Sequence, residues 1–349
     1  MMRSKGFRRI ITVIILSALA LSIYAISDYI LTYKWDNVAK EQTILIPADA
    51  NTRDLFRIIE ESGALKNFQR FKEAADKMEL ASKYKSGRYL LKKGMNNTYI
   101  VNTITHKWEQ PVRLVISGRI RNMETLATVL SRNMNADSAA FATLLKDSSI
   151  FDSLGFTKET FPAMFIPNTY EVYWSATPKT IINRLHKEYQ KFWTQERLDK
   201  ANEIGLTPNE VSTLASIVDE ESNYKPELST IAGVYMNRLN RKERLGADPT
   251  VIYALSLRDT ATIKRVLKKD LKIDSPYNTY KYKGLPPGPI RIPSIAAIDA
   301  VLSYEKHDYF FFCGRPEMDG LHNFAVTHEE HLRNARKFQK ALNEKKIYR

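Results

Sequence analysis

The longest apolar segment of the chain lies at its N-terminus. Residues 10–27 contain no charged side chain, and residues 1–9, which are basic and contain no acid, precede them. An α-helix of this length rises about 27 Å, close to the thickness of a bilayer's hydrocarbon core. The pattern predicts one transmembrane helix within residues 10–31, with residues 1–9 cytoplasmic and the bulk of the chain extracytoplasmic, at the cell inner membrane.

A cleaved signal peptide is the alternative interpretation, because Ala18-Leu19-Ala20 fits the small-x-small cleavage pattern. The apolar segment continues beyond that site, which favours an uncleaved anchor. Tyr29, Tyr33 and Trp35 follow the segment, as expected of aromatic side chains at a membrane interface. No cysteine follows closely, so a lipoprotein anchor is excluded.

Short strands alternate with short helices in the next part of the chain. We expect a small strand–helix–helix–strand module within residues 40–105, which either binds a ligand or acts as a spacer. The pattern predicts strands at 40–48, 88–91 and 112–116 and helices at 51–61, 68–80 and 98–106. A connecting, mainly helical region at 110–202, interrupted by a loop at 161–169, precedes a last domain at 203–349. The fold class expected is α+β.

The helix predicted from Thr207 to Glu221 carries the main chemical candidate. Thr207, Pro208 and Glu210 have the spacing of an N-cap with a capping box. The apolar stripe at 211, 214, 215 and 218 continues to Glu221 and Ser222 at the helix end. A carboxyl group at the rim of an apolar face favours its neutral form, the form that a general acid needs. The alternative is an ordinary exposed acid, and Asp219 and Glu220 are expected toward solvent or a flank.

Polar residues after this helix are candidates for a groove. A helix at 227–241 ends with Asn237 and Arg238, and the Asp248-Pro249 pair is typical of a helix start. We expect Asp248 to be mainly a structural cap, with a catalytic role as the alternative. The proline-rich stretch 275–290 is expected to form the wall of a site, or else to be a structural loop.

The C-terminal part contains strands at 309–313 and 322–326 before a last helix. His328 and His331 are spaced i, i+3, unlike the i, i+4 pair of zinc proteases, so a substrate-contacting or satisfied His322 is preferred to a metal ligand. Cys313 lies in an apolar strand and is expected to be a buried, inert thiol. No metal or cofactor is expected. The chain contains no Gly-x-Ser-x-Gly elbow, phosphate-binding loop or dinucleotide fingerprint.

Composition narrows the class of partner. The chain has 349 residues, 53 Lys+Arg against 39 Asp+Glu, and a formal net charge of +14. Such a charge favours a polyanionic partner, or else simply solvates the surface. An extracytoplasmic location argues against nucleic acid. A single cysteine excludes an intramolecular disulfide.

Five segments together resemble the MltG (YceG-like) family of endolytic murein transglycosylases. They are LASIVDEE at 214–221, VYMNRL at 234–239, DPTVIY at 248–253, YNTY at 277–280 and GLPPGPI at 284–290. Lys85–Tyr89 is similar to part of that family's LysM-like module. Gly246 is a departure, because the family often has Gln there.

The resemblance implies cleavage of the β-1,4 bond between N-acetylmuramic acid and N-acetylglucosamine in nascent glycan strands. The product would carry a 1,6-anhydro end, which terminates strand elongation. Glu221 would protonate the leaving oxygen and then, as a carboxylate, take the proton of the sugar's 6-hydroxyl. The implied partners are peptidoglycan, the cytoplasmic membrane and peptidoglycan synthases. The rivals are a hydrolytic muramidase that uses Glu221 with Asp248 and a non-catalytic wall-binding scaffold.

The residues expected to bind the glycan come from the same segments. They are Ser222, Asn237, Arg238, Asp248, Thr250, Tyr253, Tyr277, Asn278, Thr279, Tyr280, Pro287 and His322.

Overall fold

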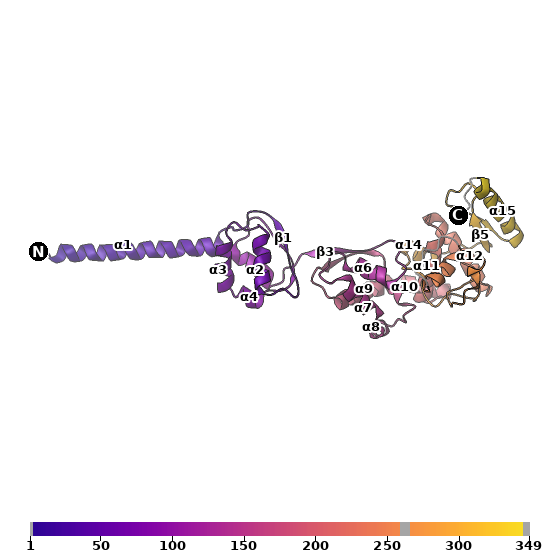
Figure 1. The fold of residues 1–349 in the computed structure, drawn as a ribbon, viewed down its shortest axis with the longest axis horizontal. Coiled ribbons are helices and arrows are strands. Elements are labelled where there is room, and N and C mark those ends of the chain that lie inside the picture. The colour runs from indigo at the N-terminus through magenta and orange to yellow at the C-terminus, as the bar shows by residue number, and fades with distance from the viewer. Residues whose placement is uncertain (1–2, 259–265, 345–349) are drawn as a thin grey trace. The chain divides into compact units, whose positions relative to one another are not determined.

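The computed structural model describes residues 3–258 and 266–344 (Figure 1). The chain divides into two compact units, and each is described by itself. The first consists of Met1–Arg113, Asn133–Ala136 and Glu171–Ala176, and the second of Leu114–Arg132, Asp137–Tyr170 and Thr177–Arg349.

The first unit begins with the long helix α1 (Arg3–Tyr29), which continues into a π-helical turn, η1 (Ile30–Lys34). The most apolar 18-residue stretch within Gly6–Lys34 has a mean hydropathy of 2.4, and none of that stretch is buried against protein. A helix this long and apolar is able to cross a membrane, as the sequence predicts. Figure 1 shows α1 as one unbroken helix.

A two-stranded antiparallel sheet with helices follows α1 in the same unit. The strands β1 (Gln42–Ile46) and β2 (Gly87–Leu91) pair from Gln42 opposite Leu91 to Ile46 opposite Gly87. The helices of this unit are α2 (Thr52–Glu61), α3 (Phe68–Lys77), α4 (Leu80–Lys83) and α5 (Asn97–Thr105). Their apolar faces bury one core cluster that includes Ile46, Phe71 and Tyr89.

Local sequence explains where these helices begin and end. Asn51 forms a capping box with Asp54 at the start of α2, and the Asn67 side chain accepts from Arg70 N–H at the start of α3. The helix predicted to reach Leu80 ends at Lys77, because Glu79 adopts the left-handed conformation with φ +57°. A short fourth helix therefore replaces the last predicted turn.

Two strands and six short helices precede the last third of the chain. The strands β3 (Pro111–Ile116) and β4 (Asn168–Tyr173) pair with each other. The helices are α6 (Met123–Ser131), α7 (Ser138–Lys146), α8 (Ser148–Ser153), η2 (Phe161–Met164), α9 (Pro178–Phe192) and α10 (Gln195–Glu203). The strand predicted at 112–116 is confirmed as β3. The prediction of helical segments and a loop after it missed β4, a strand in which Tyr170 and Val172 alternate inward.

Helix α11 (Pro208–Glu221) lies at the centre of the second unit's core. Every residue from Val211 to Val218 is buried, and the capping box between Thr207 and Glu210 is present as predicted. Helices α12 (Leu228–Asn240) and α14 (Ile295–Leu302) pack against α11 and against each other (Figure 1). The mixed α/β character of the chain is confirmed.

The remaining elements lie around this core. They are η3 (Lys225–Glu227), α13 (Asp248–Ser256), η4 (Asp270–Lys272), the hairpin of β5 (Phe311–Gly314) with β6 (His322–Ala325), and α15 (His328–Glu344). The hairpin is antiparallel, with Gly314 opposite His322. Gly314 is thus the last residue of β5, one residue beyond the strand predicted at 309–313.

Gly233 on α12 marks the closest backbone approach in this core. A Cβ at this position would lie 2.3 Å from the carbonyl oxygen of Glu305 and 2.6 Å from Nε2 of His307. The segment after α14 can therefore pack directly against the α12 backbone only because residue 233 has no side chain.

We predict that Gly233→Ala lowers the free energy of unfolding by about 1–3 kcal/mol, the usual range for overpacking a core. Thermal or urea unfolding measures it. Asn240→Ala, an exposed change on the same helix, is the control and should have little effect. Equal stability of the two variants would contradict the close packing.

Candidate active site

Glu221, the last residue of α11, lies beside two cavities of the second unit. The first has a volume of about 400 Å³ and is lined by Glu221, Tyr235, Arg238, Gly246, Asp248, Tyr280, Phe311, Phe312, Cys313, Gly314, His322, His328 and His331. The second, of about 670 Å³, shares Glu221, Gly314 and His322 with the first. A glutamate between two open cavities can meet a polymer that extends in both directions.

The carboxyl group of Glu221 is held in place by a tyrosine. Its Oε1 accepts a hydrogen bond of 2.7 Å from the hydroxyl of Tyr235, a residue of α12 that is almost fully buried. Burial raises the pKa of Glu221 to about 7; the hydrogen bond from Tyr235 lowers it, the charge of Asp248 raises it and that of Arg238 lowers it. Glu221 therefore keeps its proton up to near-neutral pH.

The two preceding acids are bound by other parts of the unit. Asp219 accepts hydrogen bonds from the backbone N–H and the hydroxyl of Ser294 at the N-terminus of α14. Glu220 forms ion pairs with Arg119 and Arg121, and its side chain is only 4% exposed. Asp219 and Glu220 thus face the flanks of the helix, one of the two expected alternatives, and Glu221 alone of the three lines the cavities.

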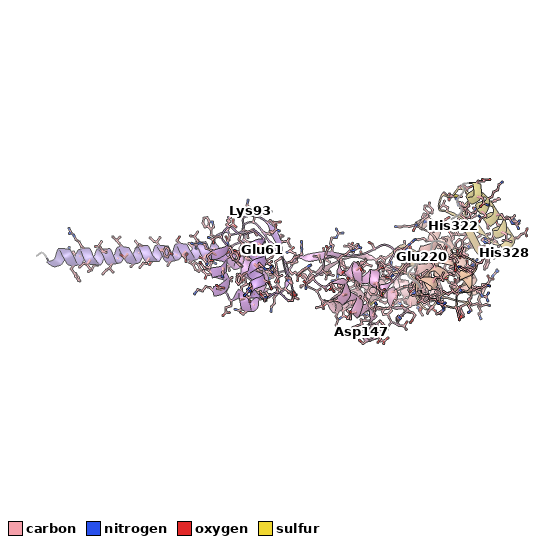
Figure 2. The ribbon with its side chains drawn as sticks, in the orientation of Figure 1. Glu61, Lys93, Asp147, Glu220, His322 and His328 are labelled. Atoms are coloured by element: carbon pink, nitrogen blue, oxygen red, sulfur yellow. The ribbon has the colours of Figure 1, made fainter. Side chains whose placement is uncertain are left out.

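Arg291 completes this arrangement from the segment before α14. Its guanidinium lies 3.5 Å from Asp219 and 3.4 Å from Glu220 and is itself largely buried. The last turn of α11 is thus fixed on both flanks. Figure 2 labels Glu220 and His322, which both belong to this unit.

Asp248 faces Glu221 from the start of α13. The predicted cap is wrong: Ala247 is the N-cap, and no side-chain cap bond forms. Oδ1 of Asp248 instead accepts a 2.6 Å hydrogen bond from the hydroxyl of Tyr280. Gly246, with φ +57°, packs beside Arg238 and Tyr280, and this left-handed conformation accounts for a glycine there.

Most other polar residues of the proline-rich segment point into the protein. Asn278 is fully buried and its amide donates to the carbonyl oxygens of Leu271 and Ile273. Thr250 and Thr279 share a buried hydrogen bond of 2.8 Å. These residues form the buried part of the segment that carries Tyr280, and their own side chains line neither cavity.

The remaining expected glycan-binding residues are dispersed. Ser222 and His322 line the second cavity. Tyr253 and Tyr277 form a T-shaped pair, and neither lines the two cavities. Asn237 donates to the carbonyl oxygens of His307 and Tyr309, and Pro287 is exposed; neither lines the two cavities.

No group of three or more metal-ligating side chains is found in residues 3–258 and 266–344. Cys313 is only partly buried and lines the first cavity, so the expectation of a buried thiol is wrong. Burial still raises its pKa, which keeps the thiol protonated and a poor nucleophile.

Several residues of the site had no signal in the sequence that marked them as functional. Tyr235 lies within the helix predicted at 227–241, and Glu227 is the first residue of that helix. The hairpin of β5 and β6 folds back onto α12. Only this fold brings to the cavity Phe311 and Phe312 of β5 together with His328 and His331 of α15. Their spacing from Glu221 follows no short motif, so no local pattern could have found them.

A single acid between two open cavities of a mixed α/β unit, with its pKa raised by burial, is the arrangement expected of an enzyme that uses acid catalysis. The model of the YceG-like family matches residues 44–337. The chain belongs to the YceG-like family.

Individual relatives agree with this membership. The chain is 27% identical over 321 residues to a protein of Bacillus subtilis (strain 168) named endolytic murein transglycosylase, with 86% of each covered. It is 27% identical over 326 residues to a protein of the same name from Streptococcus pneumoniae serotype 2 (strain D39), of which it spans only 58%. The crystal structure of a YceG-like protein from Listeria monocytogenes has a TM-score of 0.54 and 26% identity, covering 84% of this chain and 98% of that one.

The raised pKa of Glu221 makes a prediction about stability. Between the ordinary value of 4.5 and about 7 the folded protein binds more protons than the unfolded one, so the free energy of unfolding falls as pH rises through this window. Glu221→Gln removes the titration. The variant should gain stability relative to the wild type on going from about pH 5 to about pH 8, as measured by urea unfolding at both. Glu243→Gln, at an exposed position, is the control, and an identical difference at both pH values for Glu221→Gln would contradict the burial argument.

Proposed function

We propose that this protein is an endolytic murein transglycosylase. It cleaves the β-1,4 bond between N-acetylmuramic acid and N-acetylglucosamine of nascent glycan strands and leaves a 1,6-anhydro end, which terminates strand elongation. The observation that carries the proposal is Glu221: partly buried, held by Tyr235, with its pKa raised to about 7. The family membership and the names of its relatives support the same reaction.

The reaction needs one proton delivered and one removed. Protonated Glu221 gives its proton to the glycosidic oxygen as the bond from that oxygen to C1 breaks. The sugar's own 6-hydroxyl oxygen then bonds to C1, and its proton returns to the Glu221 carboxylate. No water is consumed, so the enzyme is a lyase, and a single carboxylate with a tuned pKa suffices.

A hydrolytic muramidase is the second candidate, because Asp248 lines the same cavity. A glycosidase of that kind requires a second carboxylate that activates water or attacks C1. The hydroxyl of Tyr280 occupies one oxygen of Asp248, and the charge of Asp248 helps to keep Glu221 protonated. These contacts favour a supporting electrostatic role for Asp248.

The resemblance to the same family also suggests roles for the other parts of the chain. Residues 40–105 form a LysM-like module that places the enzyme on the wall, 110–202 connect it, and 203–349 form the catalytic domain. The apolar helix anchors the chain once, with residues 1–9 cytoplasmic and the enzyme periplasmic, near the peptidoglycan synthases that supply its substrate. The excess of basic residues suits the anionic membrane surface.

Glu221→Gln should lower the rate of strand cleavage by at least about 100-fold, the usual contribution of general acid catalysis. The amide is similar in size but has no proton to deliver. Incubation of the protein with uncrosslinked glycan strands, followed by mass spectrometry of the muropeptides, counts the anhydro ends. Glu243→Gln is the matched control, and anhydro ends made at the wild-type rate by Glu221→Gln would exclude the assignment.

The proposed orientation is tested by cysteine labelling in intact cells. In a Cys313→Ser background, Glu73→Cys, at an exposed position of the first unit, should react with a maleimide that cannot cross the inner membrane, once the outer barrier is opened. Ser4→Cys should react only after lysis. Labelling of Ser4→Cys before lysis would reverse the orientation.

A further inference from the structure

A buried carboxylate holds His322 at the edge of both cavities. Oε2 of Glu227 lies 3.0 Å from Nδ1 of His322, and Oε1 accepts a hydrogen bond of 3.0 Å from the backbone N–H of His322. The Glu227 and His322 side chains are only 10% and 14% exposed. The two residues lie 95 positions apart, so η3 and β6 bring them together.

This contact sets which ring nitrogen of the imidazole carries hydrogen. A carboxylate only accepts, so Nδ1 carries the proton that Glu227 binds, and in the neutral ring Nε2 has a free lone pair. Within the described part of the chain no hydrogen bond to Nε2 of His322 is found, and His322 lines both cavities together with Glu221. Figure 2 labels His322 in the C-terminal part of the second unit.

The other histidines near the site lack this arrangement. Nε2 of His307 bonds to the carbonyl oxygen of Thr230, and His307 lines neither cavity. His331 stacks on Phe311, and its Nδ1 is buried with no hydrogen-bond partner among the described residues. The ion pairs of residues 3–258 and 266–344 include one between a histidine and a carboxylate, that of His322 with Glu227.

A carboxylate–imidazole pair is the common way in which proteins prepare a base that removes a hydroxyl proton. The carboxylate orients the ring and stabilises the imidazolium that forms. The proposed reaction contains one such step, the loss of the proton of the 6-hydroxyl while its oxygen bonds to C1. His322 lines the same cavity as Glu221, so a second group is available there for the removing step.

We propose that Nε2 of His322 accepts the proton of the sugar's 6-hydroxyl, and that Glu227 is the positioning residue that holds the ring for this transfer. Glu221 gives its proton to the leaving oxygen as the bond to C1 breaks, and the bond from O6 to C1 forms as the 6-hydroxyl proton passes to Nε2. The imidazolium then returns a proton to the Glu221 carboxylate through solvent. This inference rests on the proposed function. It assigns to His322, in place of Glu221, the step that accepts the proton of the 6-hydroxyl.

The experiment compares the wild type with His322→Gln and Glu227→Gln on uncrosslinked glycan strands. His322→Gln keeps the backbone N–H that binds Glu227 but cannot take a proton. We expect kcat to fall about 100-fold in His322→Gln, with KM nearly unchanged, and to fall less in Glu227→Gln. Because the 6-hydroxyl is then a poorer nucleophile, water should capture part of the product, giving reducing ends heavier by one water molecule. His307→Gln, a structural histidine of the same unit, is the control and should keep both kcat and the product ratio.

The outcomes separate this inference from the proposed function. Anhydro ends from the wild type test the function alone. If His322→Gln cleaves with the wild-type kcat and product ratio, or changes only KM, the inference is wrong and Glu221 performs both transfers. A wild-type kcat in Glu227→Gln would remove the positioning role. If His322→Gln unfolds more readily, His322→Gly assayed with added imidazole decides: recovery of kcat supports the base, and no recovery overturns it.

Discussion

The account depends on how the last turn of α11 is fixed. Three consecutive acids stand there, and each has a different environment: Asp219 binds the start of α14, Glu220 lies among arginines, and Glu221 is bound by Tyr235 at the cavities. Negative charges are unfavourable at the C-terminal end of a helix, where the helix dipole is itself negative, so a free end of this kind would fray. Because Ser294 and the arginines hold the first two, the third keeps one position with respect to the substrate.

The same arrangement separates the electrostatics of the three acids. Glu220 forms ion pairs with Arg119, Arg121 and Arg291, and these pairs compensate its negative charge. The carboxyl of Glu221 has a phenol as its hydrogen-bond partner and has Asp248 nearby, and its burial is uncompensated by any ion pair in the described residues. A group that is costly to ionise destabilises the folded protein above neutral pH, which is the cost of a proton donor at this position.

Periodicity predicted much of the fold because it reports burial directly. The stripe of α11 led to Glu221, and its cap was correct to the residue. The strand β4 was not predicted because its sequence, NTYEVY, is short and directly follows Pro162 and Pro167. The prolines indicated a loop, and the short alternation after them was too weak a signal to indicate a strand. Asp248 was misassigned because an Asp before Pro has the same sequence whether it caps a helix or accepts from a distant tyrosine. Tyr235 and the pair of Glu227 with His322 depend on contacts between elements far apart in the chain, and one sequence carries no signal for such contacts.

The most direct test of the central claim is the ionisation of Glu221 itself. Carbon-13 NMR of the glutamate carboxyl groups, with the Glu221 resonance assigned by its absence in Glu221→Gln, follows the titration in the free enzyme. The account predicts a midpoint near pH 7, where burial outweighs the hydrogen bond from Tyr235. A midpoint at the ordinary value of 4.5 would mean that the carboxyl is ionised and solvated at neutral pH, and the proposed acid would have no proton to give.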